Sequence, residues 1–487
     1  MDERGFTMKE YLLYIGGRWV PTESGAVIDD INPATGEVFA KIHTAGAKEV
    51  EAAISAAFAA HRAWGSSLAE ERERVLLKAA DYMEVNMMEM KDRLIDESGS
   101  TFLKTMDELA QCVSIFRTAA GECRRIDGGV VPADSPGQLS YFVRQPLGVV
   151  AGIAPFNYAM LLGLNKAAYA LAAGNTFILK PASATPISGL ILAECLEAAG
   201  IPEGVLNVVP GSGSVVGEAL VEDERVRMIA FTGSTAVGKR IAEKSARMLK
   251  RYALEMGGKN PMIVLKDYDV DKAVEMAGFG SYFHQGQICM IGSRLIVEEP
   301  IYDEFCAKME KRVRGLKSGN PHSPETCIGP LIDNNQYKVL DGHIADAVGK
   351  GARLLVGGGH DGYYYDASLL ADVTPEMNVF YEESFGPLTS IVKARDAGHA
   401  LELCNDNHYG LAAAILTNDV SLAISMSLRM EAGMVHVNDT TVMGSRRAPF
   451  GGMKNSGIGR EDSHFSVEEF TELKWLTIQY EPHGYPV

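Results

Sequence analysis

A cysteine set among polar residues is the first feature of this sequence that could do chemistry. Cys289 lies in HQGQICMIGSR, where Gly286 and Gly292 permit tight backbone turns. A thiolate nucleophile needs a base beside it and a donor for the developing oxyanion. Four of the other cysteines lie in apolar helical runs, where a free cysteine usually acts as a small hydrophobe. We therefore take Cys289 as the candidate nucleophile, with a structural cysteine as the alternative.

A glutamate and an asparagine could supply the base and the donor. Glu255 closes the apolar run YALE and precedes Gly257 and Gly258, which places a carboxylate at a strand end beside flexible backbone. This setting suits a general base, and a solvated strand-end carboxylate is the alternative. Asn157 lies between a strand that ends at Pro155 and the following helix. Its amide could donate to an oxyanion, or it could cap the helix.

Two turns between a strand and a helix carry glycines suited to binding a nucleotide. VVPGSGSVVG and AFTGSTAVG each follow an expected strand and open an expected helix, whose first amides could face a phosphate. Neither matches the G-x-G-x-x-G of an ordinary Rossmann turn. Lys180, which ends NTFILK, could reach ribose hydroxyls or an adenosine 2′-phosphate, and an exposed strand-end lysine is the alternative. The glycines are Gly211, Gly213, Gly217, Gly233 and Gly238.

The elements that must position these residues alternate along the chain. From residue 148, short apolar runs alternate with helical stretches, which predicts an α/β fold with a mostly parallel sheet between two helical layers. A second α/β stretch runs from residue 260 to about 438, and residues 46–97 indicate helices. Because ligands of parallel sheets bind beyond the carboxyl ends of the strands, residues at strand ends are the strongest candidates for a site.

The composition limits the class of protein and its partners. A chain of 487 residues that is 46% hydrophobic folds into two or three domains and is not a small disulfide scaffold. The net charge of −17 argues against nucleic acid and anionic membranes as partners. No apolar stretch approaches the ~20 residues that cross a bilayer, and the first residues do not resemble a signal peptide. The seven cysteines have no metal-type spacing, so we expect no metal and a cytoplasmic location.

Two segments fit neither α/β stretch. Residues 124–144 contain an expected hairpin around Pro132 to Gly137, and the C-terminal run TELKWLTIQY alternates like an exposed strand. We expect both to pair between subunits, which predicts a homo-oligomer, either a dimer or a tetramer. The alternative is that they cover the core of their own chain.

Seven short motifs, in this order along nearly the whole chain, resemble the successive signatures of the aldehyde dehydrogenase superfamily. The segments KPASATP and HQGQICM are similar to those of vanillin- and benzaldehyde-type dehydrogenases and of some archaeal NADP-linked members. The seven motifs are PFN (155–157), LKPAS (179–183), FTGS (231–234), LEMGGKN (254–260), GQIC (286–289), EESFGP (382–387) and PFGGMKNSGIGRE (449–461).

The resemblance implies the fold and the division of the chain. A Rossmann-like NAD(P)-binding domain would comprise residues 1–123 and 145–257, and an α/β catalytic domain residues 258–457. Residues 124–144 and 470–487 would form a small β oligomerisation arm.

The resemblance also implies a mechanism with four catalytic residues. Cys289 would attack the aldehyde, and the side chain of Asn157 with the Cys289 N–H would hold the oxyanion. Glu255 would activate the water that hydrolyses the thioester, which sets the chain apart from acyl-transferring relatives that lack this base. Lys166 matches a family lysine thought to support the site. A non-catalytic oligomer with this fold is a further alternative.

NAD or NADP is the cofactor that the resemblance implies. Ser183 stands where many NAD-preferring members have a glutamate that repels the 2′-phosphate, so we expect NADP to be accepted at least as well as NAD. Glu383 and Phe385 would contact the nicotinamide ribose and ring. The cofactor-binding residues would be Ala154, Pro155, Phe156, Lys180, Ser183, Gly213, Gly217, Phe231, Thr232, Gly233, Ser234, Val237, Met256, Glu383 and Phe385.

The resemblance implies a substrate tunnel that suits a neutral aldehyde. Six residues align with positions that line this tunnel in the family. An aromatic aldehyde similar to benzaldehyde or vanillin is the first hypothesis, and a short hydroxyaldehyde such as lactaldehyde or glyceraldehyde is the alternative. Asn165 could bond a substrate hydroxyl, or it could face water or the helix backbone. The six residues are Tyr158, Leu162, Asn165, Ile288, Met290 and Met443.

Overall fold

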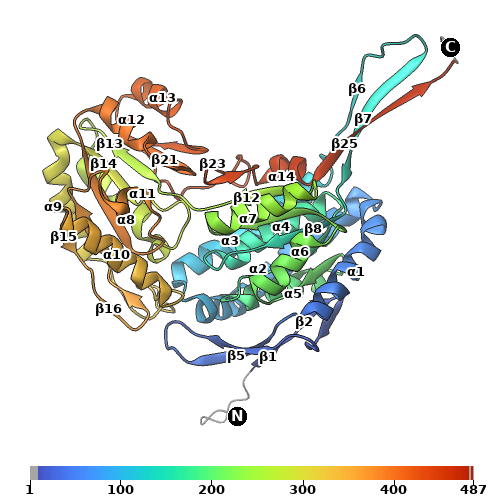
Figure 1. Ribbon diagram of the computed structural model, residues 1–487, viewed down its shortest axis with the longest axis horizontal. Coiled ribbons are helices and arrows are strands. Elements are labelled where there is room, and N and C mark those ends of the chain that lie inside the picture. The colour runs from blue at the N-terminus through green and yellow to red at the C-terminus, as the bar shows by residue number, and fades with distance from the viewer. Residues whose placement is uncertain (1–8, 482–483, 486–487) are drawn as a thin grey trace.

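Two sheets built mainly of parallel strands form the two lobes of the protein, each between layers of helices (Figure 1). The structure is a computed structural model that describes residues 9–481 and 484–485. Strands and helices alternate from residue 149 onward, which confirms the expected α/β class. Residues 1–8 of the expected cofactor domain, and 482–483 and 486–487 of the expected arm, lie outside the described residues.

The strand order of the first sheet reverses beside β8, and a ligand is expected at this point. The chain runs from β8 through β9 to β10 and then returns to the other side of β8 to add β11 and β12. The carboxyl ends of β8 and β11 therefore flank the point at which the strand order reverses, where ligands of such sheets bind. The strand order is β24 (Gly457–Ile458), β12 (Arg251–Glu255), β11 (Val226–Thr232), β8 (Val149–Ile153), β9 (Thr176–Lys180), β10 (Leu206–Val208), β2 (Leu13–Ile15) and β3 (Arg18–Val20).

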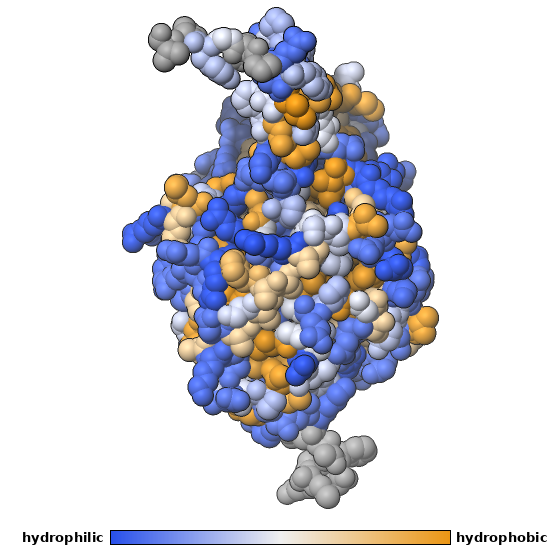
Figure 2. All heavy atoms as spheres, turned by 90° about the vertical axis from the view of Figure 1, so that its right-hand side faces the viewer, coloured by the Kyte–Doolittle hydropathy of each residue, from blue (hydrophilic) through white to orange (hydrophobic). Residues whose placement is uncertain are grey.

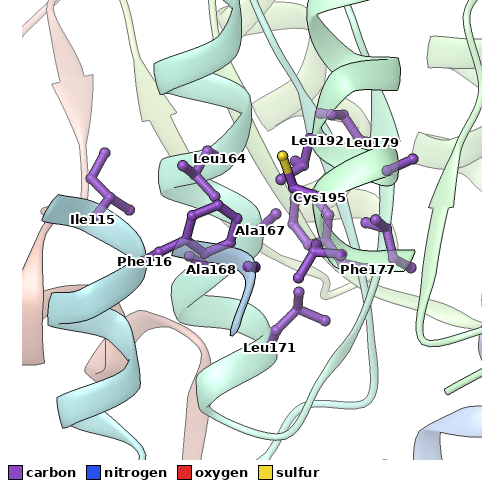
Figure 3. Packing of buried hydrophobic residues seen from close by; sticks show 14 of the residues in the cluster. Ile115, Phe116, Leu164, Ala167, Ala168, Leu171, Phe177, Leu179, Leu192 and Cys195 are labelled. Carbon is purple, nitrogen blue, oxygen red and sulfur yellow. The ribbon is translucent and has the colours of Figure 1, made fainter. Parts of the chain in front are cut away.

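Helices bury both faces of this sheet because the side chains of its strands alternate between two cores. Phe177 and Leu179 of β9 join one hydrophobic cluster, and Ile178 joins the other. The first cluster, seen in Figure 3, packs α4 (Ala159–Ala172) and α5 (Pro186–Ala198) under α2 (Ala69–Ser98) and α3 (Phe102–Glu122). The second cluster packs α1 (Ala47–Gly65), α6 (Glu218–Glu222) and α7 (Thr235–Arg247).

The second sheet is built in the same way. Helices α8 and α9 share one hydrophobic cluster, and α10 to α13 share the other. The strand order is β15 (Arg353–Val356), β18 (Ser368–Ala371), β19 (Leu388–Ala394), β14 (Arg294–Glu298), β13 (Pro261–Val264), β21 (Ala412–Leu416) and β22 (Met434–Val437). The helices are α8 (Val270–Tyr282), α9 (Tyr302–Arg314), α10 (Asn335–Gly349), α11 (Asn378–Tyr381), α12 (Ala397–Asn405) and α13 (Val420–Ser427).

A three-stranded arm projects from the first lobe (Figure 1). The hairpin β6 (Gly129–Val131) and β7 (Gln138–Pro146) forms as expected, and β25 (Thr471–Gln479) pairs antiparallel with β7 over its full length. Trp475 is 69% exposed, and Figure 2 shows hydrophobic side chains on the side of the molecule that carries the arm. The arm therefore does not cover the core of its own chain.

Within the described residues, no helix has both the length and the apolar character needed to span a membrane.

The remaining elements are short. The short elements are β1 (Lys9–Tyr11), β4 (Val27–Ile31), β5 (Val38–His43), β16 (His360–Asp361), β17 (Tyr364–Tyr365), β20 (Tyr409–Gly410), β23 (Met453–Lys454), α14 (Ser463–Glu469), the π-helical turn η1 (Gly213–Gly217) and the 3₁₀ turns η2 (Phe283–Gly286) and η3 (Glu299–Ile301).

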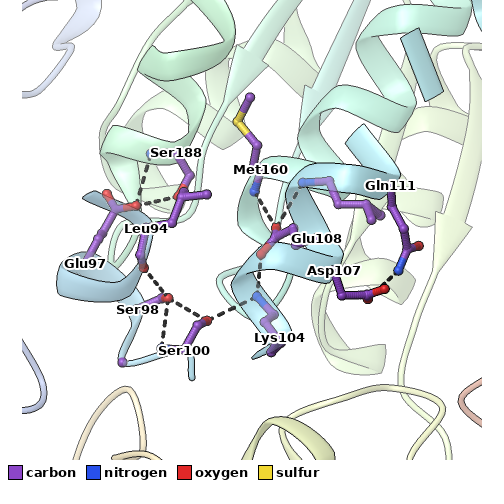
Figure 4. A network of polar contacts seen from close by, with 12 residues as sticks. Leu94, Glu97, Ser98, Ser100, Lys104, Asp107, Glu108, Gln111, Met160 and Ser188 are labelled. Carbon is purple, nitrogen blue, oxygen red and sulfur yellow. Dashed lines mark hydrogen bonds and ion pairs between the residues drawn. The ribbon is translucent and has the colours of Figure 1, made fainter. Parts of the chain in front are cut away.

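A buried ion pair fixes the start of α4, just after the carboxyl end of β8. Glu108 of α3 accepts hydrogen bonds of 3.1 Å from the N–H groups of Met160 and Leu161, and it pairs with Lys104 (Figure 4). Both charged side chains are at most 2% exposed. Glu108 thus satisfies the free amides of the helix N-terminus while its own charge is balanced.

Replacing Glu108 by alanine is expected to lower the free energy of unfolding by about 3–5 kcal/mol, because it leaves the Lys104 charge buried without a partner. Urea unfolding measures the loss. Glu84→Ala is the matched control, because Glu84 pairs with Arg117 at the surface, where ion pairs contribute at most about 1 kcal/mol. Equal losses in the two variants would contradict a stabilising role of the buried pair.

Candidate active site

A cavity of about 610 Å³ between the two lobes brings two of the four catalytic candidates together, whereas Glu255 and Lys166 do not line it. Cys289 and Asn157 line it, and so do all six residues expected on the substrate side. They come from the end of β8, from α4, and from segments of the second lobe that are more than a hundred residues away in the chain. The nucleophile candidate, the amide donor and a substrate-sized space therefore share one place.

The loop that carries Cys289 is held by unusual backbone geometry. His284, Gln285 and Gly286 all have positive φ, at 52°, 50° and 72°. A side chain at Gly286 would put its Cβ 2.1 Å from the Gly386 carbonyl oxygen, so only glycine fits. Asn260 donates from Nδ2 to the carbonyl oxygen of Cys289 at 2.8 Å. The sulfur is therefore placed by a rigid turn rather than a loose loop.

The Cys289 thiol is protonated in the resting protein. Burial raises its pKa to about 12, and the carboxylates of Glu383 and Glu255 act in the same direction. Hydrogen bonds from the backbone N–H groups of Met290 and Cys289 oppose this shift. Because the pKa remains well above neutral pH, the site needs a proton acceptor to produce a thiolate.

The rate of Cys289 alkylation by iodoacetamide is expected to rise about tenfold per pH unit from neutral to alkaline pH. Only the thiolate reacts, and a thiol whose pKa is raised gains thiolate until the pH passes that pKa. The measurement uses a Cys327→Ala background, because Cys327 is exposed. A rate that levels off near neutral pH would contradict the raised pKa.

Glu255 ends β12 and is buried, not solvated. It is 3% exposed, and neither carboxylate oxygen has a hydrogen-bond partner within the described part of the chain. Burial raises its pKa well above the usual range, and the nearby Glu461 raises it further. The carboxylate lies against Gly451, with Oε1 2.8 Å from where a Cβ would stand there. A buried carboxylate with a raised pKa is a strong proton acceptor.

Asn157 is not the helix cap. The first helical residue of α4 is Ala159 and the cap position is Tyr158, so the capping alternative is wrong. Asn157 is 3% exposed and lines the cavity beside Cys289. Its side chain can therefore be reached by a molecule bound in the cavity.

A buried polar cluster joins the end of β11 to the chain near its C-terminus. Lys166 donates from Nζ to Thr232 Oγ1 at 2.6 Å and to Glu461 Oε1 at 2.7 Å. Asn165 donates to Glu461 Oε2 at 3.0 Å, so it faces neither water nor the helix backbone. The sequence reasoning did not single out Glu461, although it ends the last motif, because its partner Lys166 is 295 residues away.

The residues expected to hold the cofactor phosphates and ribose lie at the ends of β9 and β11. Ser234 caps α7 without a side-chain hydrogen bond, so the first amides of that helix face outward for a ligand. Lys180 is 4% exposed, which excludes the exposed alternative, and its Nζ donates to the Pro181 carbonyl oxygen at 2.8 Å. Burial lowers the Lys180 pKa to about 8. Ser183 donates to the Gly211 carbonyl oxygen at 3.2 Å, and a Cβ on Gly217 would stand 3.9 Å from the Lys180 side chain.

The other expected cofactor residues meet where the two lobes face each other. Phe156 and Phe385 pack edge to face with ring centroids 5.7 Å apart. Glu383 accepts a hydrogen bond from the Gly258 N–H at 3.0 Å, and burial raises its pKa to about 7. Around β11 and α7, Phe231 and Met256 are buried and Val237 is exposed, and Gly233 lies between these two elements. Ala154 and Pro155 directly follow β8, and Gly213 begins η1, where no atom of the described residues lies within 4 Å of the place of a Cβ.

Several cavity residues were missed from the sequence. They lie on the exposed part of α3, at the end of α8 and the start of η2, and in the segment that ends at Phe450. The spacing of three and four residues along α3 could have shown that these side chains share one face of the helix. It could not have shown which part of the protein that face contacts. The residues are Asp107, Gln111, Ser114, Phe279, Phe283, Arg446 and Phe450.

Comparison with known proteins decides the family. A model of the aldehyde dehydrogenase family matches residues 19–476. The chain belongs to the aldehyde dehydrogenase family. It is 41% identical to a vanillin dehydrogenase of Pseudomonas sp., covering 98% of this chain and 99% of the relative. It is 38% identical to a benzaldehyde dehydrogenase of Bacillus subtilis, covering 97% and 98%. The chain is therefore an oxidoreductase that acts on aldehydes.

Solved structures confirm the aldehyde dehydrogenase fold. A salicylaldehyde dehydrogenase from Pseudomonas putida, complexed with salicylaldehyde, matches with a TM-score of 0.96 at 36% identity, covering 98% of this chain and all of that one. An NADP dependent enzyme of E. coli matches at 0.95 and 37%, covering 97% and 98%. An NAD-dependent aldehyde dehydrogenase from Sinorhizobium meliloti matches at 0.96 and 33%, covering 99% and 98%. Members of this family thus use either NAD or NADP.

Proposed function

We propose that this aldehyde dehydrogenase oxidises aromatic aldehydes to carboxylic acids. The observation that carries the proposal is the cavity, in which Cys289 and Asn157 meet an aromatic wall. Phe279 and Phe283 stack there with centroids 4.8 Å apart, and Tyr158 lies on the same cavity. A planar ring gains contact area and favourable ring packing in such a space. The relatives named for vanillin, benzaldehyde and salicylaldehyde support the same substrate class.

The residues of the site can perform the reaction in two stages. The sulfur of Cys289 adds to the aldehyde carbon while the thiol proton passes to solvent, and the oxyanion accepts hydrogen bonds from Asn157 Nδ2 and the Cys289 N–H. A bound nicotinamide dinucleotide would supply acceptance of a hydride from the former aldehyde carbon, which leaves a thioester on Cys289. Glu255 then takes a proton from water, the water oxygen adds to the thioester carbon, and the carbon–sulfur bond breaks to release the acid.

Glu255 must turn from Gly451 toward the sulfur to do this. Its carboxylate has no partner to hold it in its present position, so little is lost when the side chain rotates. Lys166 and Glu461 lie close enough to influence its charge, since both shift its pKa. Glu461 raises the Glu255 pKa and Lys166 lowers it, so we infer that this buried cluster sets how readily Glu255 takes a proton from water.

A panel of aldehydes tests the proposed function directly. Formation of reduced cofactor is measured with benzaldehyde, vanillin, salicylaldehyde, lactaldehyde and glyceraldehyde, each with NAD and with NADP. We expect the highest kcat/KM among the aromatic aldehydes. A clear preference for the short hydroxyaldehydes would overturn the aromatic assignment and favour the alternative substrate class.

We propose that the protein accepts NADP at least as readily as NAD. Lys180 lies beside Gly217 and Ser183 bonds Gly211 at the other end of the same glycine-rich turn, so a 2′-phosphate there would attract the lysine and meet a serine where a carboxylate would repel it. Ser183→Glu is expected to lower kcat/KM for NADP about tenfold or more while NAD is affected less, because the new carboxylate repels the phosphate. Ser183→Gln is the uncharged control. Equal effects of the two substitutions on NADP would contradict the electrostatic explanation.

The arm is proposed to join two copies of the chain. Its strand β25 has a free edge, and Val130, Leu473 and Trp475 are each more than half exposed.

We propose that the first lobe binds the cofactor and the second carries the nucleophile, with the domain limits expected from the sequence. The seven free cysteines suit the reducing cytoplasm.

A further inference from the structure

One wall of the cavity carries a row of hydrogen bonds that the proposed mechanism does not use. Arg446 donates from Nη1 to Asp462 Oδ1 at 3.4 Å and from Nη2 to Gln111 Oε1 at 3.1 Å. Gln111 in turn donates from Nε2 to Asp107 Oδ2 at 2.5 Å. Both ends of the Gln111 amide are therefore engaged, which holds Arg446 and Asp107 on either side of it.

This row lies on the face of α3 that borders the cavity. Asp107, Ala110, Gln111 and Ser114 all line it, and their spacing of three, four and seven residues puts them on one side of the helix. Elsewhere the cavity is lined by aromatic rings, including the stacked Phe279 and Phe283. The space thus combines apolar walls for a ring with a polar wall for a substituent.

Asp107, at one end of the polar row, is exposed at the mouth of the cavity, whereas Asn157 and Ile288, which line the cavity with Cys289, are deeply buried. Ile288, Asn157 and Asn165 are 2%, 3% and 2% exposed, whereas Met443 is 40% exposed and Asp107 is exposed as well. An aldehyde that places its carbonyl carbon at Cys289 therefore directs the far side of its ring toward the mouth of the cavity.

Resting on the proposed function, we propose that Arg446 and Asp107 select aromatic aldehydes that carry a hydroxyl group on the ring position far from the aldehyde. A guanidinium has five N–H donors, and Arg446 uses two of its nitrogen atoms in the bonds described, so it can still donate to the hydroxyl oxygen. Asp107 has its Oδ1 to accept the hydroxyl proton, while Oδ2 is bonded to Gln111.

A hydroxyl group satisfies this pair better than the alternatives. It donates and accepts at once, whereas a methoxy group only accepts and a methyl group does neither. An ionised substituent would meet the acidic side chains of Asp107 and Glu461, which line the cavity along with Arg446, so charge attraction alone does not explain recognition. The site is partly open to water, which limits the gain to about tenfold rather than the much larger ratios of closed sites.

The test compares 4-hydroxybenzaldehyde with 4-methylbenzaldehyde, which has nearly the same shape, at a pH where the phenol is neutral. For the unaltered enzyme we expect kcat/KM to be about tenfold higher with the hydroxyl compound. Arg446→Met removes the donor, and Gln111→Leu removes the hydrogen bond that holds Arg446 in place. Each variant should therefore lose most of this preference. Benzaldehyde, measured with each variant, reports whether the variant is folded and active.

The matched control is Arg447→Met. Arg447 follows Arg446 directly, is exposed and does not line this cavity, so its loss should leave the preference unchanged. Equal rates for the two 4-substituted aldehydes with the unaltered enzyme would overturn the proposal, as would an unchanged preference in both cavity variants. If benzaldehyde and its derivatives are all unreactive, the proposed function itself fails; if benzaldehyde reacts without a hydroxyl preference, only this proposal fails.

Discussion

Replacing Cys289 by alanine is expected to abolish aldehyde oxidation, with kcat reduced by about 10⁴-fold or more. The sulfur is the only group in the proposed mechanism that bonds to the substrate, and no neighbouring side chain in the cavity has comparable nucleophilicity. Formation of reduced cofactor with benzaldehyde measures the loss.

A second cysteine provides the control for this substitution. Cys306 is buried in α9 of the same lobe, and burial raises its pKa to about 11, so it resembles Cys289 in environment but does not line the cavity. Cys306→Ala should retain activity once any loss of stability is taken into account by thermal melting. Full activity in Cys289→Ala would show that the proposed mechanism is wrong.

Glu255→Gln is expected to separate the two stages of the reaction. Glutamine keeps the shape of the side chain but cannot take a proton, so the first turnover should give a burst of about one reduced cofactor per active site. The following steady rate should fall by roughly 10²–10⁴-fold, the usual contribution of a general base. Rapid-mixing measurements of cofactor reduction distinguish the burst from the steady rate.

Two further measurements make this prediction specific. Hydroxylamine attacks a thioester without help from a base, so it should restore turnover in Glu255→Gln but not in Cys289→Ala. Glu298→Gln is the matched control, because Glu298 is also a buried glutamate at the end of a parallel strand, although it pairs with Lys266 away from the site. If Glu255→Gln shows neither a burst nor rescue by hydroxylamine, Glu255 acts in thioester formation instead of in hydrolysis.

The local features of the site could be predicted from the sequence because each depends on residues close together in the chain. Continuous apolar runs predicted β8, β9 and β11, since strands buried on both faces need apolar side chains at every position. Parallel strands bring their carboxyl ends to one edge, so Asn157, Thr232 and Glu255 could be placed near one another without coordinates. The order of motifs then sufficed to predict the family.

The alternatives left open by the sequence were settled by burial, which depends on the whole fold. For both Glu255 and Lys180 a solvated charge at a strand end was an alternative, yet both are almost fully buried, and burial shifts their pKa values in opposite directions. Asn157 proved not to be a cap because α4 begins two residues later.

Contacts between distant segments were decided by the tertiary structure alone. Glu461 meets Lys166 across 295 residues, and Arg446 meets Gln111 across 335, so no local pattern could report either contact. The free edge and exposed Trp475 of the arm likewise follow from where β25 pairs. A sequence records which face of each element is apolar and what stands at its ends, whereas the partners of those ends are fixed only when the two lobes pack together.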